Sequence, residues 1–118
     1  DKPLQVTIEE YRPARKPDQN AVMWAGPLKD IAEQAYFDGK RYSAEVWHEM
    51  FKRELLPDEF DPEQCRDGYQ KFAIDPKGAQ VLIGSTTQLT VRGMALYIQQ
   101  LEAFGANLGV DFHTKGPQ

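Results

Sequence analysis

The spacing of the apolar residues changes once near the start of this chain, and that change requires a fold with both strands and helices. Between Leu4 and Ile8 apolar side chains occupy every second position, the pattern of a half-buried strand. From Asp18 to Ala35 they follow helical spacing instead. Pro27 lies inside this helix, and because proline lacks an N–H and its ring crowds the preceding turn, we expect a kink or break there. The opening third therefore predicts a strand followed by an interrupted helix.

The central part of the chain predicts a second helix and then a hairpin. Ser43 is suited to cap this helix, whose inward-facing residues are expected to be Val46, Trp47, Met50, Phe51 and Leu55. Residues 56–68 hold two prolines and many acids, which is typical of an exposed acidic loop. Two strands are predicted at 69–74 and 80–83, because Asp75-Pro76-Lys77-Gly78 between them has the composition of a tight turn.

The last third predicts a long capped helix. The segment Ser85–Leu89 is interpreted as β-prone or extended, and Thr90 as the cap of the final helix. Gly109 followed by an apolar residue indicates a left-handed helix end, and residues 111–118 are expected to fray. The resulting order β–α–α–β–β–α, with three helices and a small, mainly antiparallel sheet, belongs to the α+β class. A chain of 118 residues suits a single domain.

Composition restricts the classes of function. The net charge is −4 and the isoelectric point about 5.1, which as a whole opposes non-specific affinity for nucleic acid. The acids gather at 58–63, however, and the first third carries several cations, so one face of the molecule can still be basic. Cys65 is the single cysteine and cannot form an intramolecular disulfide. A cytoplasmic protein without a metal or cofactor is the default expectation, and no apolar run is long enough to span a membrane.

The densest group of polar functions is the block from Arg15 to Trp24. Arg15 and Lys16 precede a helix whose first turn holds Gln19 and Asn20, and Trp24 follows one turn later. A helix N-terminus beside cations and amides can receive a phosphate, and an indole can stack on a base. The alternative is an ordinary capped helix with its tryptophan in the core, and residue chemistry alone favours that alternative.

Two weaker candidates lie elsewhere. The run Ser85-Thr86-Thr87-Gln88 offers hydroxyls and an amide, the groups that contact phosphates and base edges. Arg41 with Tyr42 before the second helix is a further basic and aromatic pair. Each also has an ordinary structural explanation: a polar strand edge leading to a cap for the first, and a capped helix start for the second.

Catalysis has no positive support in the sequence. No Ser/His/Asp order, Cys/His pair, phosphate-binding loop or dinucleotide fingerprint is present. His48 and His113 have no partner at metal-ligand spacing, and His48 is interpreted as a satisfied surface histidine. A metal-dependent nuclease that joins distant acids, such as Asp18 and Asp30, is the remaining enzymatic alternative.

The order of these motifs resembles a known family. Matching residues are Val6-Thr7-Ile8, Asp18-Gln19-Asn20, Trp24-Ala25, Leu28, Asp30, Gly39, Arg41, Ser43–Glu45, Trp47, Val81-Leu82-Ile83-Gly84 with the Ser/Thr run, Val91, Ala103-Phe104-Gly105-Ala106 and Gly109-Val110. This pattern, which covers nearly the whole chain except the acidic loop, resembles the phage NinB (Orf) recombination proteins. The resemblance implies a phage or prophage-encoded, non-enzymatic recombination mediator. Such a protein binds single-stranded, duplex and branched DNA, cooperates with the host single-strand-binding protein, assists recombinase loading and forms a homodimer.

The resemblance also assigns residues. The family's DNA-facing amide and tryptophan motif falls on Gln19, Asn20 and Trp24, and its Ser/Thr run on Ser85, Thr86 and Thr87. Where the family often has a cation, this chain has Gln88, and the loss of one phosphate contact should flatten the salt dependence of binding. Arg15, Lys16 and Arg41 are added on chemistry alone.

Three functional hypotheses follow. The first is the DNA-binding mediator. In a more specific version of it, Trp24 stacks against an unpaired base, so that binding distorts the duplex or flips a base out. The second is a protein-interaction adaptor for the single-strand-binding protein with weak DNA affinity, favoured by the acidic loop and negative charge. The third is the nuclease.

Overall fold

The structure, a computed structural model, describes residues 19–112 and confirms the α+β class. Its elements are α1 (Gln19–Ala25), α2 (Pro27–Gln34), α3 (Ala44–Leu55), β1 (Phe72–Ile74), β2 (Gln80–Leu82), the 3₁₀-helix η3 (Thr86–Gln88) and α4 (Val91–Asn107). Helices, hairpin and final helix follow one another in the predicted order. The strand expected at residues 4–8 lies outside the described residues, as does Asp18.

The predicted interruption at Pro27 divides the first helix in two. Helix α1 ends at Ala25, Gly26 has φ −110° and ψ −97°, and Pro27 occupies the first position of α2. Proline is tolerated there because the first N–H groups of a helix have no partner within the helix. Met23 from α1 and Leu28 from α2 are both fully buried, so the break redirects the backbone while both segments still face the core.

Helix α3 begins as expected but buries a narrower stripe. Ser43 accepts a hydrogen bond from the Val46 N–H (3.3 Å), which confirms the cap. Trp47 and Phe51 are buried, whereas Val46 is 52% exposed, so its predicted inward position is wrong. The reason is geometric: Trp47 and Phe51 lie one turn apart on the side that packs, and Val46 is rotated about 100° away from Trp47.

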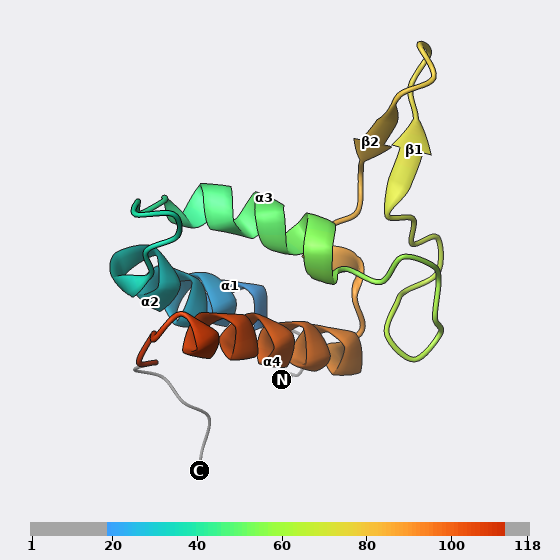
Figure 1. The fold of residues 1–118 in the computed structure, drawn as a ribbon. Coiled ribbons are helices and arrows are strands. Elements are labelled where there is room, and N and C mark those ends of the chain that lie inside the picture. Colours follow the sequence, from blue (N-terminus) through green and yellow to red (C-terminus); the bar gives the residue numbers. More distant parts are fainter. Residues whose placement is uncertain (1–18, 113–118) are drawn as a thin grey trace, which may run out of the picture.

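The core lies among α2, α3 and α4. Trp47 stacks on Phe51 with ring centroids 5.6 Å apart, and Phe104 from α4 meets both rings nearly edge-on. Leu101 of α4 and Ile31 of α2 are fully buried beside them. Figure 1 shows α3 and α4 lying alongside each other in opposite directions, with α1 and α2 next to them. This aromatic cluster holds together helices that are far apart in the sequence.

The hairpin projects away from the helices (Figure 1). Its antiparallel register pairs Phe72 with Leu82 and Ile74 with Gln80, within the predicted strand segments but shorter than them. The Asp75 carboxylate accepts the N–H groups of Lys77 and Ala79, each at 2.9 Å, which confirms the predicted turn. Because only two short strands pair, much of the hairpin's apolar surface stays uncovered. Its exposed apolar side chains are Ile74, Val81 and Ile83.

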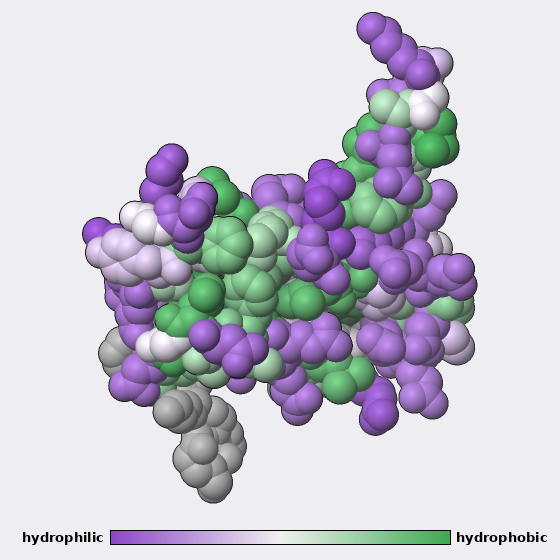
Figure 2. All heavy atoms as spheres, in the orientation of Figure 1, coloured by the Kyte–Doolittle hydropathy of each residue, from purple (hydrophilic) through white to green (hydrophobic). Residues whose placement is uncertain are grey.

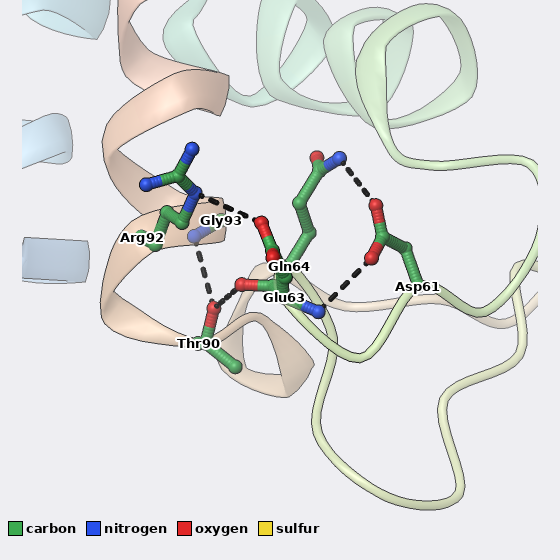
Figure 3. A network of polar contacts seen from close by, with 6 residues as sticks. All are labelled: Asp61, Glu63, Gln64, Thr90, Arg92 and Gly93. Carbon is green, nitrogen blue, oxygen red and sulfur yellow. Dashed lines mark hydrogen bonds and ion pairs between the residues drawn. The ribbon is translucent and has the colours of Figure 1, made fainter.

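The acidic segment 56–68 is less exposed than predicted. Leu56 and Cys65 are buried, and between them the chain packs against the start of α4. Figure 3 shows the contacts: Thr90 donates its hydroxyl to the Glu63 carbonyl (2.8 Å), and Arg92 pairs with the Glu63 carboxylate at 3.6 Å. We call residues 56–68 the acidic strap. Its charged side chains are exposed, except for the half-buried Asp61, and its backbone bonds to Thr90 at the start of α4.

The C-terminal end of α4 has the predicted left-handed terminator. Gly109 has φ +85°, and the N–H groups of Gly109 and Val110 bond the Ala106 and Gly105 carbonyls, which is the Schellman pattern. The expectation that residues 111–118 fray is wrong at Asp111, and residues 113–118 lie outside the described residues. The Gln34 side chain both donates to the Asp111 carbonyl (2.9 Å) and accepts its N–H (2.7 Å), so α2 holds this residue.

Candidate nucleic-acid interface

One hydrogen bond joins the two polar motifs that the sequence singled out. The Thr86 hydroxyl donates to the Asn20 side-chain oxygen at 2.7 Å, across 66 residues of sequence. Gln19 on the same helix donates to the Val91 carbonyl at 3.3 Å. The first turn of α1 therefore lies beside η3 and the first turn of α4. The bond uses the oxygen of Asn20 and orients the amide whose nitrogen has two further donors.

The Ser/Thr run is a 3₁₀ turn, which corrects the interpretation as a β-prone or extended segment. The Ser85 hydroxyl oxygen accepts the Thr87 N–H (3.1 Å) and shares a 2.8 Å hydrogen bond with the Thr87 hydroxyl. Local side-chain bonds of this kind offer the backbone an alternative to a strand. Thr86 is buried and faces Asn20, whereas Thr87 is exposed. The turn thus buries the Thr86 hydroxyl against Asn20, while the hydrogen-bonded hydroxyls of Ser85 and Thr87 lie at an exposed position.

Trp24 combines the two alternatives that the sequence left open. It is half-buried and packs against the hydrophobic core, as expected for a core residue of a capped helix. Its ring also meets the His48 ring of α3, with centroids 4.7 Å apart and planes at 47°. Part of the indole remains accessible one turn beyond Asn20. The position is compatible with both core packing and a contact to a base.

A cation missed by the sequence reasoning borders this surface. Arg66, an exposed residue of the acidic strap, donates its backbone N–H to the Gln88 carbonyl (2.9 Å) and its Nε to the Leu89 carbonyl (3.3 Å). A guanidinium therefore lies beside Gln88, the position at which the family resemblance predicts a cation. Because Arg66 sits in an acidic stretch far from Gln88 in sequence, no local pattern indicated it.

Arg41 lies at the other end of the molecule. Its Nη1 donates to the Glu33 carbonyl in the last turn of α2 (3.0 Å), and its guanidinium is 5.8 Å from the centroid of the Tyr36 ring. Gln34 at the end of α2 bonds to Asp111, just past the end of α4. Asn20 and Thr86 lie near the start of α4. A helix of 17 residues is about 25 Å long. The structure therefore does not bring Arg41 together with the other candidates.

The remaining candidates either lie outside the described residues or are not grouped with other possible metal ligands. Arg15 and Lys16 precede residue 19, and so does Asp18 of the nuclease hypothesis. Asp30, its proposed companion, is 3% exposed in the first turn of α2. Among residues 19–112 no three acidic, histidine or cysteine side chains are grouped as metal ligands. Within the same residues, none of the helices is both long and apolar enough to cross a bilayer.

Fold and surface together define a small α+β protein in which amide and hydroxyl side chains from distant segments share one surface beside an exposed cation. Comparison with known families is consistent with this description. The family model of the NinB protein matches residues 1–113. The chain therefore belongs to the NinB family of phage proteins.

Individual relatives agree. The chain is 32% identical over 110 residues to the P21 prophage-derived protein NinB of Escherichia coli O6:H1, and equally to protein ninB of Escherichia phage lambda. Each match covers 92% of this chain and 66% of the relative, so the chain spans just under two thirds of these proteins. A solved NinB structure from structural genomics is 31% identical and superimposes with a TM-score of 0.56, over 94% of this chain and 74% of that one. The residues that the family model matches, 1–113, include both polar motifs.

Proposed function

We propose that this protein is a non-enzymatic, DNA-binding recombination mediator of phage or prophage origin. The observation that carries the proposal is the hydrogen bond between Asn20 and Thr86, which unites the two motifs on one surface. Side-chain amides and hydroxyls of this kind contact bases and phosphates in nucleic-acid complexes. Membership of the NinB family supports a recombination role.

Within this proposal the residues divide by task. Gln19, Asn20 and Trp24 contact exposed bases, and Trp24 stacks on an unpaired base or displaces one from the duplex.

Other residues contact the sugar-phosphate backbone of DNA. Ser85 and Thr87 do so through their hydroxyls, and Gln88 through its side-chain amide. Arg66 supplies a phosphate contact beside them, and Arg15 and Lys16 add cations ahead of α1. This surface takes single-stranded, duplex and branched DNA, and the mediator works with the host single-strand-binding protein to load a recombinase.

The salt dependence of binding tests the division. Fluorescence anisotropy of labelled single-stranded, duplex and forked DNA, titrated at several salt concentrations, counts the phosphates that the protein neutralises. Affinity falls as salt rises, and Arg66→Ala should make the negative slope of log affinity against log salt shallower by about 1. Arg41→Ala is the matched control, because both arginines are exposed and bond a backbone carbonyl. A slope that becomes shallower only for Arg41→Ala would place the interface at the other end of α4.

Base displacement has its own readout. Fluorescence of 2-aminopurine placed in a duplex rises when the base leaves the stack. We expect the rise with the wild-type protein and its loss in Trp24→Ala. An unchanged signal with the wild type at saturating protein would remove base displacement from the proposal and leave DNA binding intact.

An interaction adaptor is the second candidate, and the projecting hairpin favours it. Figure 2 shows apolar side chains on this hairpin, and Ile74, Val81 and Ile83 are 68%, 40% and 47% exposed. Exposed apolar residues on a projecting element are typical of an association surface. Affinity for purified single-strand-binding protein without any affinity for bare DNA would support the adaptor over the mediator.

We further propose a homodimer as the working assembly, as the family resemblance implies. Sedimentation equilibrium of the wild type measures the mass directly, and Ile74→Asp with Val81→Asp tests whether the hairpin contributes. A monomer at micromolar concentration would contradict the dimer without bearing on DNA binding.

A further inference from the structure

The contact between Trp24 and His48 joins two helices that are separate in the chain. His48 comes from the middle of α3, and its ring centroid is 4.7 Å from that of Trp24 on α1. Both residues are half-buried. The histidine and the hydrophobic core therefore each cover part of Trp24 and restrict the orientations that the indole can take, and the residue remains partly exposed.

The structure indicates no hydrogen-bonding task for the buried nitrogen of His48. Its Nδ1 atom is shielded from solvent and has no hydrogen-bond partner among the described residues. Burial lowers the His48 pKa, with the nearby Lys52 charge acting in the same direction and Glu49 opposing it. At neutral pH the side chain thus presents a flat, uncharged ring. This ring packs against an aromatic neighbour, which corrects the interpretation of His48 as a satisfied surface histidine.

We propose that His48 is a positioning residue for Trp24, holding the indole in the orientation in which its accessible surface stacks on an unpaired nucleobase. This inference rests on the proposed DNA-binding function. A side chain whose orientation is already fixed loses less conformational entropy when it binds a ligand. His48 therefore contributes to affinity without contacting DNA.

A double-mutant cycle separates positioning from general stability. The variants are Trp24→Ala, His48→Ala and the double mutant, and the probes are a fluorescein-labelled thymidine strand and an abasic strand of equal length. We expect His48→Ala to weaken binding of the thymidine strand by about three- to tenfold. In the Trp24→Ala background the same change should have less than about a twofold effect, because the residue it positions is absent. Neither change should alter binding of the abasic strand.

Two further variants control the cycle. His48→Phe keeps a flat ring against the indole and should bind the thymidine strand within about twofold of wild type. Val46→Ala alters an exposed side chain on the same helix and should change nothing. Circular dichroism confirms folding, and His48→Gln replaces His48→Ala in the cycle if the alanine variant does not fold.

The outcomes are distinct. Equal losses from His48→Ala with and without Trp24, or an equal loss on the abasic strand, would overturn the positioning role. Wild-type binding that His48→Ala leaves unchanged would refute the role and leave the proposed function standing. A wild-type protein that binds neither strand would refute the proposed function itself, and the positioning role with it.

Discussion

Thr86 donates its hydroxyl proton to the side-chain oxygen of Asn20, so one hydrogen bond fixes the spacing between the first turn of α1 and the turn that precedes α4. Thr86 is 5% exposed, which shields the bond from competing water. The same two residues belong to the motifs proposed to contact DNA. Structure and binding are therefore coupled at this point, and variants here must be assessed for both.

Replacing Thr86 by valine should lower the free energy of unfolding by about 1–3 kcal/mol, because the change keeps the shape but leaves the Asn20 oxygen without its donor. Urea denaturation measures this difference. Thr87→Val is the control: Thr87 is exposed, so its loss should stay within about 0.5 kcal/mol. Equal stability of Thr86→Val and wild type would show that water replaces the lost donor.

Gly93→Ala should destabilise the protein through the acidic strap. A Cβ at this position would lie 2.1 Å from the Gln64 carbonyl oxygen, and a backbone atom cannot move aside as a flexible side chain can. We expect a loss of about 1–3 kcal/mol, as for other overpacked sites, measured by chemical denaturation. Val91→Ala changes the same turn of α4 at a residue that is 69% exposed and should have little effect. If Gly93→Ala left the protein as stable as wild type, the strap would have to shift freely.

Lys71→Met should loosen the base of the hairpin. The Lys71 ammonium is buried and donates to the Leu56 carbonyl and the Asp58 carboxylate, both at 2.9 Å. Methionine fills similar space but leaves the Leu56 carbonyl unpaired, at a cost of about 1–3 kcal/mol. Lys77→Met at the exposed hairpin tip serves as the comparison in the same urea titration. A more stable Lys71→Met variant would indicate that desolvation of the ammonium outweighs its two bonds.

Alkaline pH should remove a contribution made by Tyr69. Burial, helped by nearby Cys65 and Asp58, raises the Tyr69 pKa to about 12, and its hydroxyl donates to the Pro57 carbonyl. Between about pH 10 and 12 the folded state holds a proton that the unfolded chain releases, so stability falls as pH rises through this window. The contribution is complete below about pH 10. Unfolding of Tyr69→Phe at stepped pH should therefore differ most from wild type below this window and converge above it.

A matched tyrosine checks this assignment. Tyr36 is 61% exposed, and Tyr36→Phe is the control for the same substitution at the surface. If the difference between wild type and Tyr69→Phe stayed constant up to about pH 12, the hydroxyl would not be the group that titrates.

Local sequence was sufficient to predict the features whose hydrogen bonds close within a few residues. Ser43 and Thr90 cap their helices, Asp75 closes the hairpin turn, and Gly109 ends α4, because each needs only its own neighbours. The break at Pro27 follows from the same local logic. Where a pattern also depended on packing, as at Val46, local reasoning was wrong.

Contacts between distant segments could not be predicted from local sequence and follow from the packing of the helices. Asn20 reaches Thr86, Arg66 lies beside Gln88, and Trp24 contacts His48, each pair brought together from separate parts of the chain. These contacts depend on how the helices pack around Trp47 and Phe51, since a small rotation of a helix changes which side chains touch. The spacing of residues in the sequence does not predict that rotation. The family resemblance identified the residues of each motif, and the packing of the core places the motifs next to each other.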